Sequence, residues 1–214
     1  MKHCGSIGYP EDWESCCLWD GKLSVQFGFP ADGWVLLSVL TTAYNRSLTI
    51  HLSNTYDPFW DMVDWLKAIA DGNLPASFKI DEEGNYKELI VRSYQGKYSD
   101  YADIEFRING DYWDEEAEES KECCYFLSRA LRSQLLHEFA RRLDQWLNED
   151  YDADGWNRSW CEDDPVNPFT DLKNLDIAGL KEKIKSNRIP VTDSESQPQV
   201  PHHRVYGSVN CGSD

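Results

Sequence analysis

The sequence predicts an α+β domain: an antiparallel sheet of about six strands with two helices on one face, the second helix long, followed by an irregular C-terminal extension. Several short segments alternate apolar and polar residues, which is typical of half-buried strands. Two other segments repeat apolar residues with the helical period. The segments follow one another as three strands and a helix, twice, and helices kept to one face of an antiparallel sheet are typical of α+β folds.

The first three strands are expected at residues 22–29, 34–43 and 47–53. Apolar side chains occupy every second position in the first and the third segment. The middle segment is apolar at almost every position, as expected for a strand that is buried on both faces. Short turn-forming stretches separate the three, so they are predicted to form an antiparallel meander.

A helix is expected at residues 57–71. Asp57 is a favourable N-cap residue, and Pro58 suits the first helical position because it has no N–H to satisfy. Gly72 is a favourable C-terminal stop. The apolar residues in between recur on one face, and most of the acidic ones lie off that face.

Three further strands are expected at residues 77–81, 86–94 and 101–108, and the last of these alternates most regularly. A long helix is then expected at residues 119–148, because leucine or phenylalanine recurs every fourth residue over most of it. At 1.5 Å per residue such a helix would be about 40 Å long.

Three regions are therefore expected along the chain. Residues 1–21 form an irregular N-terminal segment, and residues 22–150 form the α+β domain. Residues 151–214 form an extension with a short helix near 172–186, followed by a tail rich in Ser, Gln, Pro, Gly and His that is expected to be mobile.

The negative charge is concentrated in two segments. The formal net charge is -17, and Asp100–Glu122 contains 10 acidic and 2 basic residues. Glu149–Asp164 contains 7 acidic residues and 1 basic residue, whereas the segment between the two is slightly basic. Acidic residues before a helix N-terminus are stabilising, but those after a helix C-terminus are not, so the second segment is the better candidate for a binding surface.

Composition also limits the partners and the compartment. A sequence pI of about 4.6 argues against nucleic acid and anionic membranes, because both are themselves negative. No apolar run approaches the length of a membrane span or of a secretory signal. Seven cysteines, two pairs of which are adjacent, favour reduced thiols. We therefore expect a cytoplasmic protein that binds neither nucleic acid nor membrane.

No motif predicts a catalytic residue, a metal site or a cofactor. The adjacent Cys16 and Cys17 lack the spacing of a structural zinc site, and the acidic run at 150–155 lacks the later glutamate of a calcium loop. His51 and His137 are expected to be surface histidines rather than partners of a cysteine nucleophile. Clustered carboxylates leave open an enzyme with a carboxylate site in a cleft.

The candidate binding residues are aromatic and acidic side chains in or beside the two charged segments. Such a mixture can attract a cationic partner over a distance and anchor it on contact. The alternative is a solvated loop with favourable helix-end electrostatics. The candidates are Tyr112, Trp113, Asp114, Glu115, Glu116, Asp150, Tyr151, Asp152, Asp154, Trp156, Trp160, Glu162, Asp163 and Asp164.

Within roughly residues 47–84, the runs Ser53–Phe59, Trp65–Gly72 and Leu74–Gly84 resemble small uncharacterised bacterial α+β proteins, some of them immunity or accessory proteins of toxin systems. The resemblance implies a cytosolic bacterial protein. It favours a non-enzymatic binding protein of immunity or inhibitor type, whose basic protein partner would be a toxin or a defence protein. A further alternative is a subunit of a larger assembly, with the Trp-rich region 146–169 buried against a neighbour.

Overall fold

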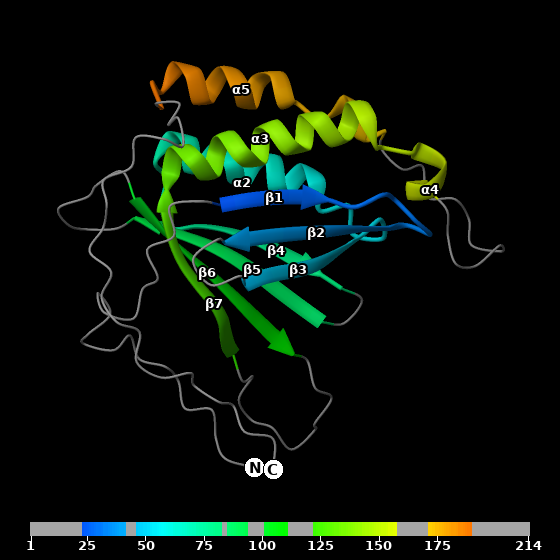
Figure 1. Cartoon of the computed structure of the whole chain (residues 1–214), viewed down its shortest axis with the longest axis horizontal. Coiled ribbons are helices and arrows are strands. Elements are labelled where there is room, and N and C mark those ends of the chain that lie inside the picture. Colours follow the sequence, from blue (N-terminus) through cyan, green and yellow to red (C-terminus); the bar gives the residue numbers. More distant parts are fainter. Residues whose placement is uncertain are drawn as a thin grey trace, which may run out of the picture.

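The computed structural model describes residues 23–41, 46–82, 85–93, 101–110, 122–157 and 171–189. Two antiparallel sheets form the framework (Figure 1). The smaller sheet has the order β1-β2-β3 and the larger sheet the order β4-β5-β6-β7. The strands are β1 (Leu23–Phe27), β2 (Trp34–Thr41), β3 (Arg46–Ser53), β4 (Ala76–Asp81), β5 (Asn85–Ser93), β6 (Tyr101–Gly110) and β7 (Glu122–Leu131).

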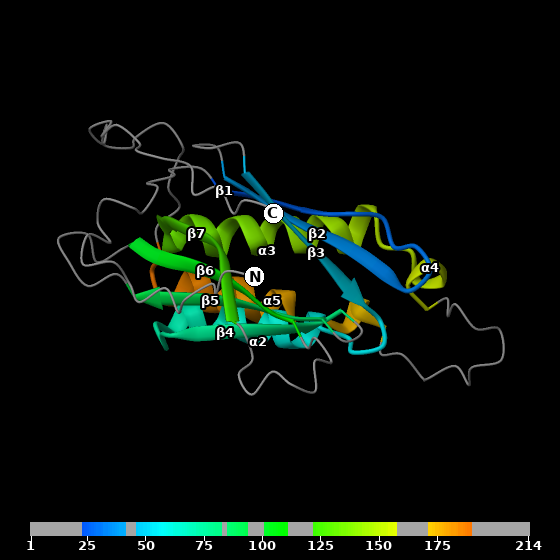
Figure 2. The same ribbon diagram turned by 90° about the horizontal axis from the view of Figure 1, so that it is seen from below.

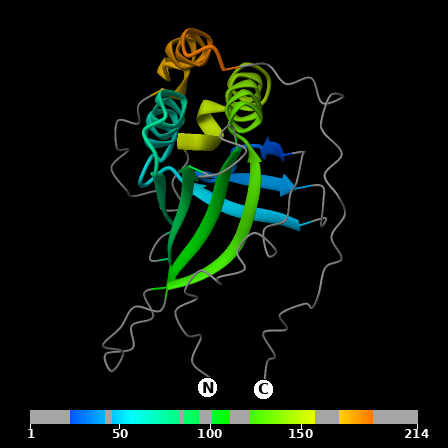
Figure 3. The same cartoon turned by 90° about the vertical axis from the view of Figure 1, so that its left-hand side faces the viewer.

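The helices lie on one side of these sheets, with α5 outermost (Figure 3). Helix α2 runs antiparallel to α3, because Phe59 stacks on Trp146 and Trp65 meets Phe139. None of the helices in the described ranges is both long and apolar enough to cross a bilayer. The helices are α2 (Phe59–Asp71), α3 (Arg132–Glu149), α4 (Ala153–Asn157), the 3-10 turn η1 (Leu172–Asn174) and α5 (Ile177–Ser186).

The α+β class is confirmed, but the arrangement differs from the single six-stranded sheet expected. There are two sheets, and the first part of the expected long helix is strand β7. The chain passes from β7 to α3 at Leu131, whose backbone is extended (φ -64, ψ 128). A spacing of four residues between apolar positions fits a strand as well as a helix, because four is also an even number. Pairing with β6 then decides the conformation of this segment.

The core lies between the two sheets and the helices. Trp65 joins these layers: its ring is 5.8 Å from Phe78 on β4 and 5.5 Å from Phe139 on α3. Its indole Nε1 also donates to the Ala76 carbonyl at 3.2 Å. Part of the expected extension belongs to the same core, since α4 contributes Trp156 and α5 contributes three buried apolar residues, Ile177, Leu180 and Ile184.

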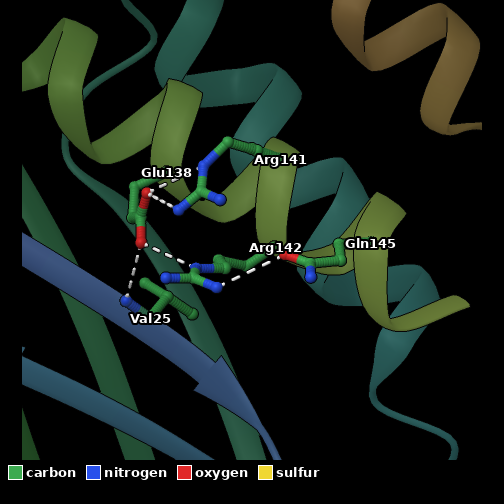
Figure 4. A network of polar contacts seen from close by, with 5 residues as sticks. All are labelled: Val25, Glu138, Arg141, Arg142 and Gln145. Carbon is green, nitrogen blue, oxygen red and sulfur yellow. Dashed lines mark hydrogen bonds and ion pairs between the residues drawn. The ribbon is translucent and has the colours of Figure 1, made fainter. Parts of the chain in front are cut away.

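Both edges of the smaller sheet are covered by a glutamate that accepts a backbone N–H. On the β1 edge, Glu138 of α3 accepts the Val25 N–H at 3.3 Å (Figure 4). On the β3 edge, Glu82 accepts the His51 N–H at 2.6 Å and also binds Lys87. Unpaired edge strands invite pairing with other chains, so these two glutamates protect the sheet as well as join it to its neighbours.

Candidate partner-binding surface

One end of the molecule, which we call the acidic end, lies on the right in Figure 1. It contains the N-terminus of α2, the C-terminus of α3 and the two short elements α4 and η1. The antiparallel α2–α3 pair brings the first two together. Helix α5 runs parallel to α2, since Lys67 binds Asp176 at 2.9 Å and Asp71 binds Lys183 at 2.7 Å. The acidic residues at this end therefore come from three separate parts of the sequence.

A rigid aromatic cluster underlies the acidic end. Phe59 stacks on Trp146 at 5.1 Å and meets the edge of Trp156 at 5.3 Å. Trp146 in turn contacts Tyr151 at 5.4 Å and donates its indole N–H to the Gly28 carbonyl at 2.8 Å. These side chains lock α3 to α2 and to the loop after β1, so the acidic residues above them have a well-defined backbone.

Trp156 is not the exposed anchor that the sequence suggested, because it is fully buried. Two backbone contacts hold it inward: the Gly33 N–H donates to the Gly155 carbonyl at 3.0 Å, and Asn54 Nδ2 donates to the Trp156 carbonyl at 2.7 Å. A side chain at Gly155 would lie 2.6 Å from the Pro30 carbonyl oxygen, so only glycine allows this approach.

Tyr151 and Asp152 also have structural positions. Tyr151 is half-buried against Trp146, and burial raises the pKa of its hydroxyl. The nearby Asp171 and Asp57 carboxylates raise this pKa further. Asp152 caps α4, since its carboxylate accepts the N–H groups of Asp154 at 3.2 Å and Gly155 at 3.1 Å. Neither residue is a free contact point, although the exposed Asp152 still adds negative charge.

Asp150 and Asp154 are exposed, as expected, and so is Glu149 beside them. None of the three forms an ion pair with a lysine or arginine of the described ranges. The other nine candidates lie outside the described residues: Tyr112, Trp113, Asp114, Glu115, Glu116, Trp160, Glu162, Asp163 and Asp164.

Three acidic residues at this end were not among the sequence candidates: Asp57, Asp61 and Asp171. The sequence predicts Asp57 as the N-cap of the first helix, but Pro58 occupies that position and Asp57 has a positive φ of 35°. Burial raises the pKa of the Asp57 carboxyl, and the Phe59 N–H and the nearby Trp60 indole oppose the rise only in part. Only the topology brings Asp57 and Asp171 close to Tyr151, so no local sequence signal identifies them.

Several buried polar atoms at the acidic end have no hydrogen-bond partner among the residues that the structure describes. They come from the start of α2 and from the region of α4: Asp57 Oδ1, Trp60 Nε1, Tyr151 O–H, Trp156 Nε1 and Asn157 Oδ1. A buried polar group without a partner costs about 1–3 kcal/mol.

The helix ends explain how this end tolerates its charge. The C-terminus of α3 is itself partly negative, which makes Glu149 and Asp150 unfavourable there. The N-termini of α2 and α5 lie at the same end and supply the opposite partial charge. Asp176 uses it directly, because its carboxylate accepts the Gly179 N–H at 2.9 Å.

Surface hollows also lie beside the sheets. One, of about 430 Å³, lies between α2 and β4 and includes Asp61 and Asp64. The other, of about 320 Å³, is lined by Trp34, His51 and Glu82. Within the described ranges no three His, Cys, Asp or Glu side chains are grouped so as to hold a metal ion. Asp57, whose pKa is raised, lines neither hollow.

No family model, curated protein or solved structure matches this chain.

Proposed function

We propose that this chain is a non-enzymatic binding protein of immunity or inhibitor type, which engages a basic protein partner through the acidic end. The observation that carries the proposal is the exposed trio Glu149, Asp150 and Asp154, which lack a cationic partner among the described residues. The trio stands on the aromatic cluster around Trp146, which holds the backbone beneath it.

The energetics of the trio support this role. Segment 149–157 contains four acidic residues and no basic one, so its charges repel one another in the free protein. Neighbouring carboxylates at a helix C-terminus lower stability by a few tenths of a kcal/mol to about 1 kcal/mol each. A cationic partner would relieve that repulsion, and a concentrated negative field would also speed its approach.

The test compares two charge-reversed proteins with equal net charge. In the first, Glu149→Lys and Asp154→Lys change the acidic end; in the second, Asp64→Lys and Glu182→Lys change exposed acids on α2 and α5. A basic protein that co-purifies with the native chain should bind the second variant nearly normally. Its affinity for the first should fall by roughly tenfold or more, since each lost ionic contact removes about 1 kcal/mol. Equal affinity for both variants would refute the proposal.

A further inference from the structure

We infer that Phe29 and Tyr56 are the apolar anchors of the partner-binding surface, and that they bind a basic protein segment whose apolar side chains are flanked by lysine or arginine. The inference rests on the proposed function and names the contacts that hold the partner once its charge has attracted it. Phe29 is 68% exposed and Tyr56 is 52% exposed, which makes them the two most exposed large apolar side chains among the described residues. The fully buried Trp156 cannot take this role.

Phe29 lies between two contacts that join the turn after β1 to the acidic end. The residue before it, Gly28, accepts the Trp146 indole N–H at 2.8 Å, which ties the turn to the last part of α3. The residue after it, Pro30, is buried, and its carbonyl oxygen lies against Gly155 of α4. Figures 1 and 2 both show the turn from β1 to β2 beside α4. The backbone of Phe29 is therefore fixed beside both segments that carry the exposed acids.

Tyr56 is placed beside α4 by its own neighbours in the chain. Asn54, two residues earlier, donates from Nδ2 to the Trp156 carbonyl at 2.7 Å and from its backbone N–H to the Gly33 carbonyl at 2.8 Å. Pro58, two residues later, is buried at the start of α2. Both exposed rings thus stand on backbone that is already ordered, so a partner that covers them loses little affinity to the ordering of loops.

The charge around the two rings determines the chemistry of the partner. The segments that these contacts join are residues 27–34, 53–60 and 146–157, and together they contain six acidic residues and no lysine or arginine. A purely apolar partner would remove water from these acids and offer no positive charge in return, which is costly. Lysine or arginine beside the apolar contact would pair with them instead. An apolar centre with a basic rim is therefore the surface that fits this end of the molecule.

The first arm of the test uses a labelled synthetic helical peptide of leucine and lysine with its leucines on one face, and a control peptide of the same composition in scrambled order. Fluorescence anisotropy measures their binding to the full chain. Phe29→Ala and Tyr56→Ala should each weaken binding of the amphipathic peptide by roughly tenfold, since exposed aromatic anchors carry much of the affinity of an interface. The matched control, Tyr86→Ala, removes a tyrosine that is 44% exposed on β5 and should leave binding unchanged.

Because Phe29 is exposed, Phe29→Ala should leave the thermal unfolding temperature unchanged, and Phe29→Tyr should bind the amphipathic peptide nearly normally. Equal binding of that peptide by the wild type and Phe29→Ala would overturn the inference. Equal binding of the two peptides by the wild type would overturn it as well, because charge alone would then account for the complex.

The second arm uses the basic protein that co-purifies with the native chain, and it separates this failure from failure of the proposed function. Phe29→Ala should raise the dissociation rate by roughly tenfold and leave the salt dependence of association unchanged, whereas Glu149→Lys with Asp154→Lys should slow association. If the charge reversal slows association while Phe29→Ala dissociates like Tyr86→Ala, the acidic end binds the partner without these anchors and the inference is refuted. If neither variant changes the kinetics, the proposed function fails too.

Discussion

Replacing Glu138 by alanine tests how the helical layer is joined to the smaller sheet. The side chain is 15% exposed and accepts from Arg141 (2.7 Å), Arg142 (3.1 Å) and the Val25 N–H (3.3 Å). Val25 is fully buried, so its N–H would be left without a partner, at about 1–3 kcal/mol. Arg141 is 55% exposed and adds well under 1 kcal/mol. We expect Glu138→Ala to lower the free energy of unfolding by about 2–3 kcal/mol in total.

The pH dependence makes this prediction specific. Burial alone would raise the pKa of Glu138, but hydrogen bonds from Arg141, Arg142 and Val25 outweigh it, so its pKa in the folded protein is lowered. A lowered pKa stabilises the folded state above the unfolded value of about 4.3, and the stabilisation is lost as pH falls through the folded pKa. Urea unfolding of the wild type, Glu138→Ala and the exposed control Glu149→Gln, at pH 7 and at pH 3, measures both effects. A Glu138→Ala midpoint equal to that of wild type at pH 7, or an unchanged difference at pH 3, would refute the reasoning.

Three further substitutions test the acidic end and the second sheet edge. Trp156→Ala should cost about 3–5 kcal/mol in thermal unfolding, whereas Trp156→Phe should cost much less, because the indole N–H has no hydrogen-bond partner among the described residues; similar losses would contradict its placement. Asp57→Asn should stabilise the protein at pH 7, because a carboxyl whose pKa is raised on folding opposes folding once it is ionised; the gain should vanish below about pH 3.9. Glu82→Ala should lower the unfolding free energy by about 0.5–1.5 kcal/mol, because Lys87 and the exposed His51 N–H lose their acceptor and water replaces it only in part; no change would show that this edge needs no cover.

The sequence predicts the strands β1 to β6, because period-two alternation directly reflects a strand with one buried face. It does not predict that the strands divide into two sheets. It does not reveal β7. The leucines from 127 onward suit either conformation, and no glycine or proline separates the strand from the helix that begins at Arg132. The conformation of residues 122–131 is decided by their pairing with β6, which is a tertiary contact and not a local propensity.

The candidate site was predictable only in part. Asp150 and Asp154 are exposed, as their charge suggests. Trp156 lies in a helix of five residues, too short to show a periodic pattern, and its burial depends on Asn54, about a hundred residues earlier. Asp57 and Asp171 reach the acidic end because of the relative orientation of α2, α3 and α5. The local sequence around either residue does not encode that orientation.

The central claim is that the exposed acids after α3 attract and hold a basic protein. Stopped-flow association with the captured partner, over a range of salt concentrations, tests it most directly when wild type is compared with Glu149→Lys, Asp150→Lys and Asp154→Lys combined. We expect the wild-type association rate to fall steeply with salt, and the triple variant to associate at least about tenfold more slowly at low salt with little salt dependence. Equal rates and equal salt dependence for the two proteins would contradict it.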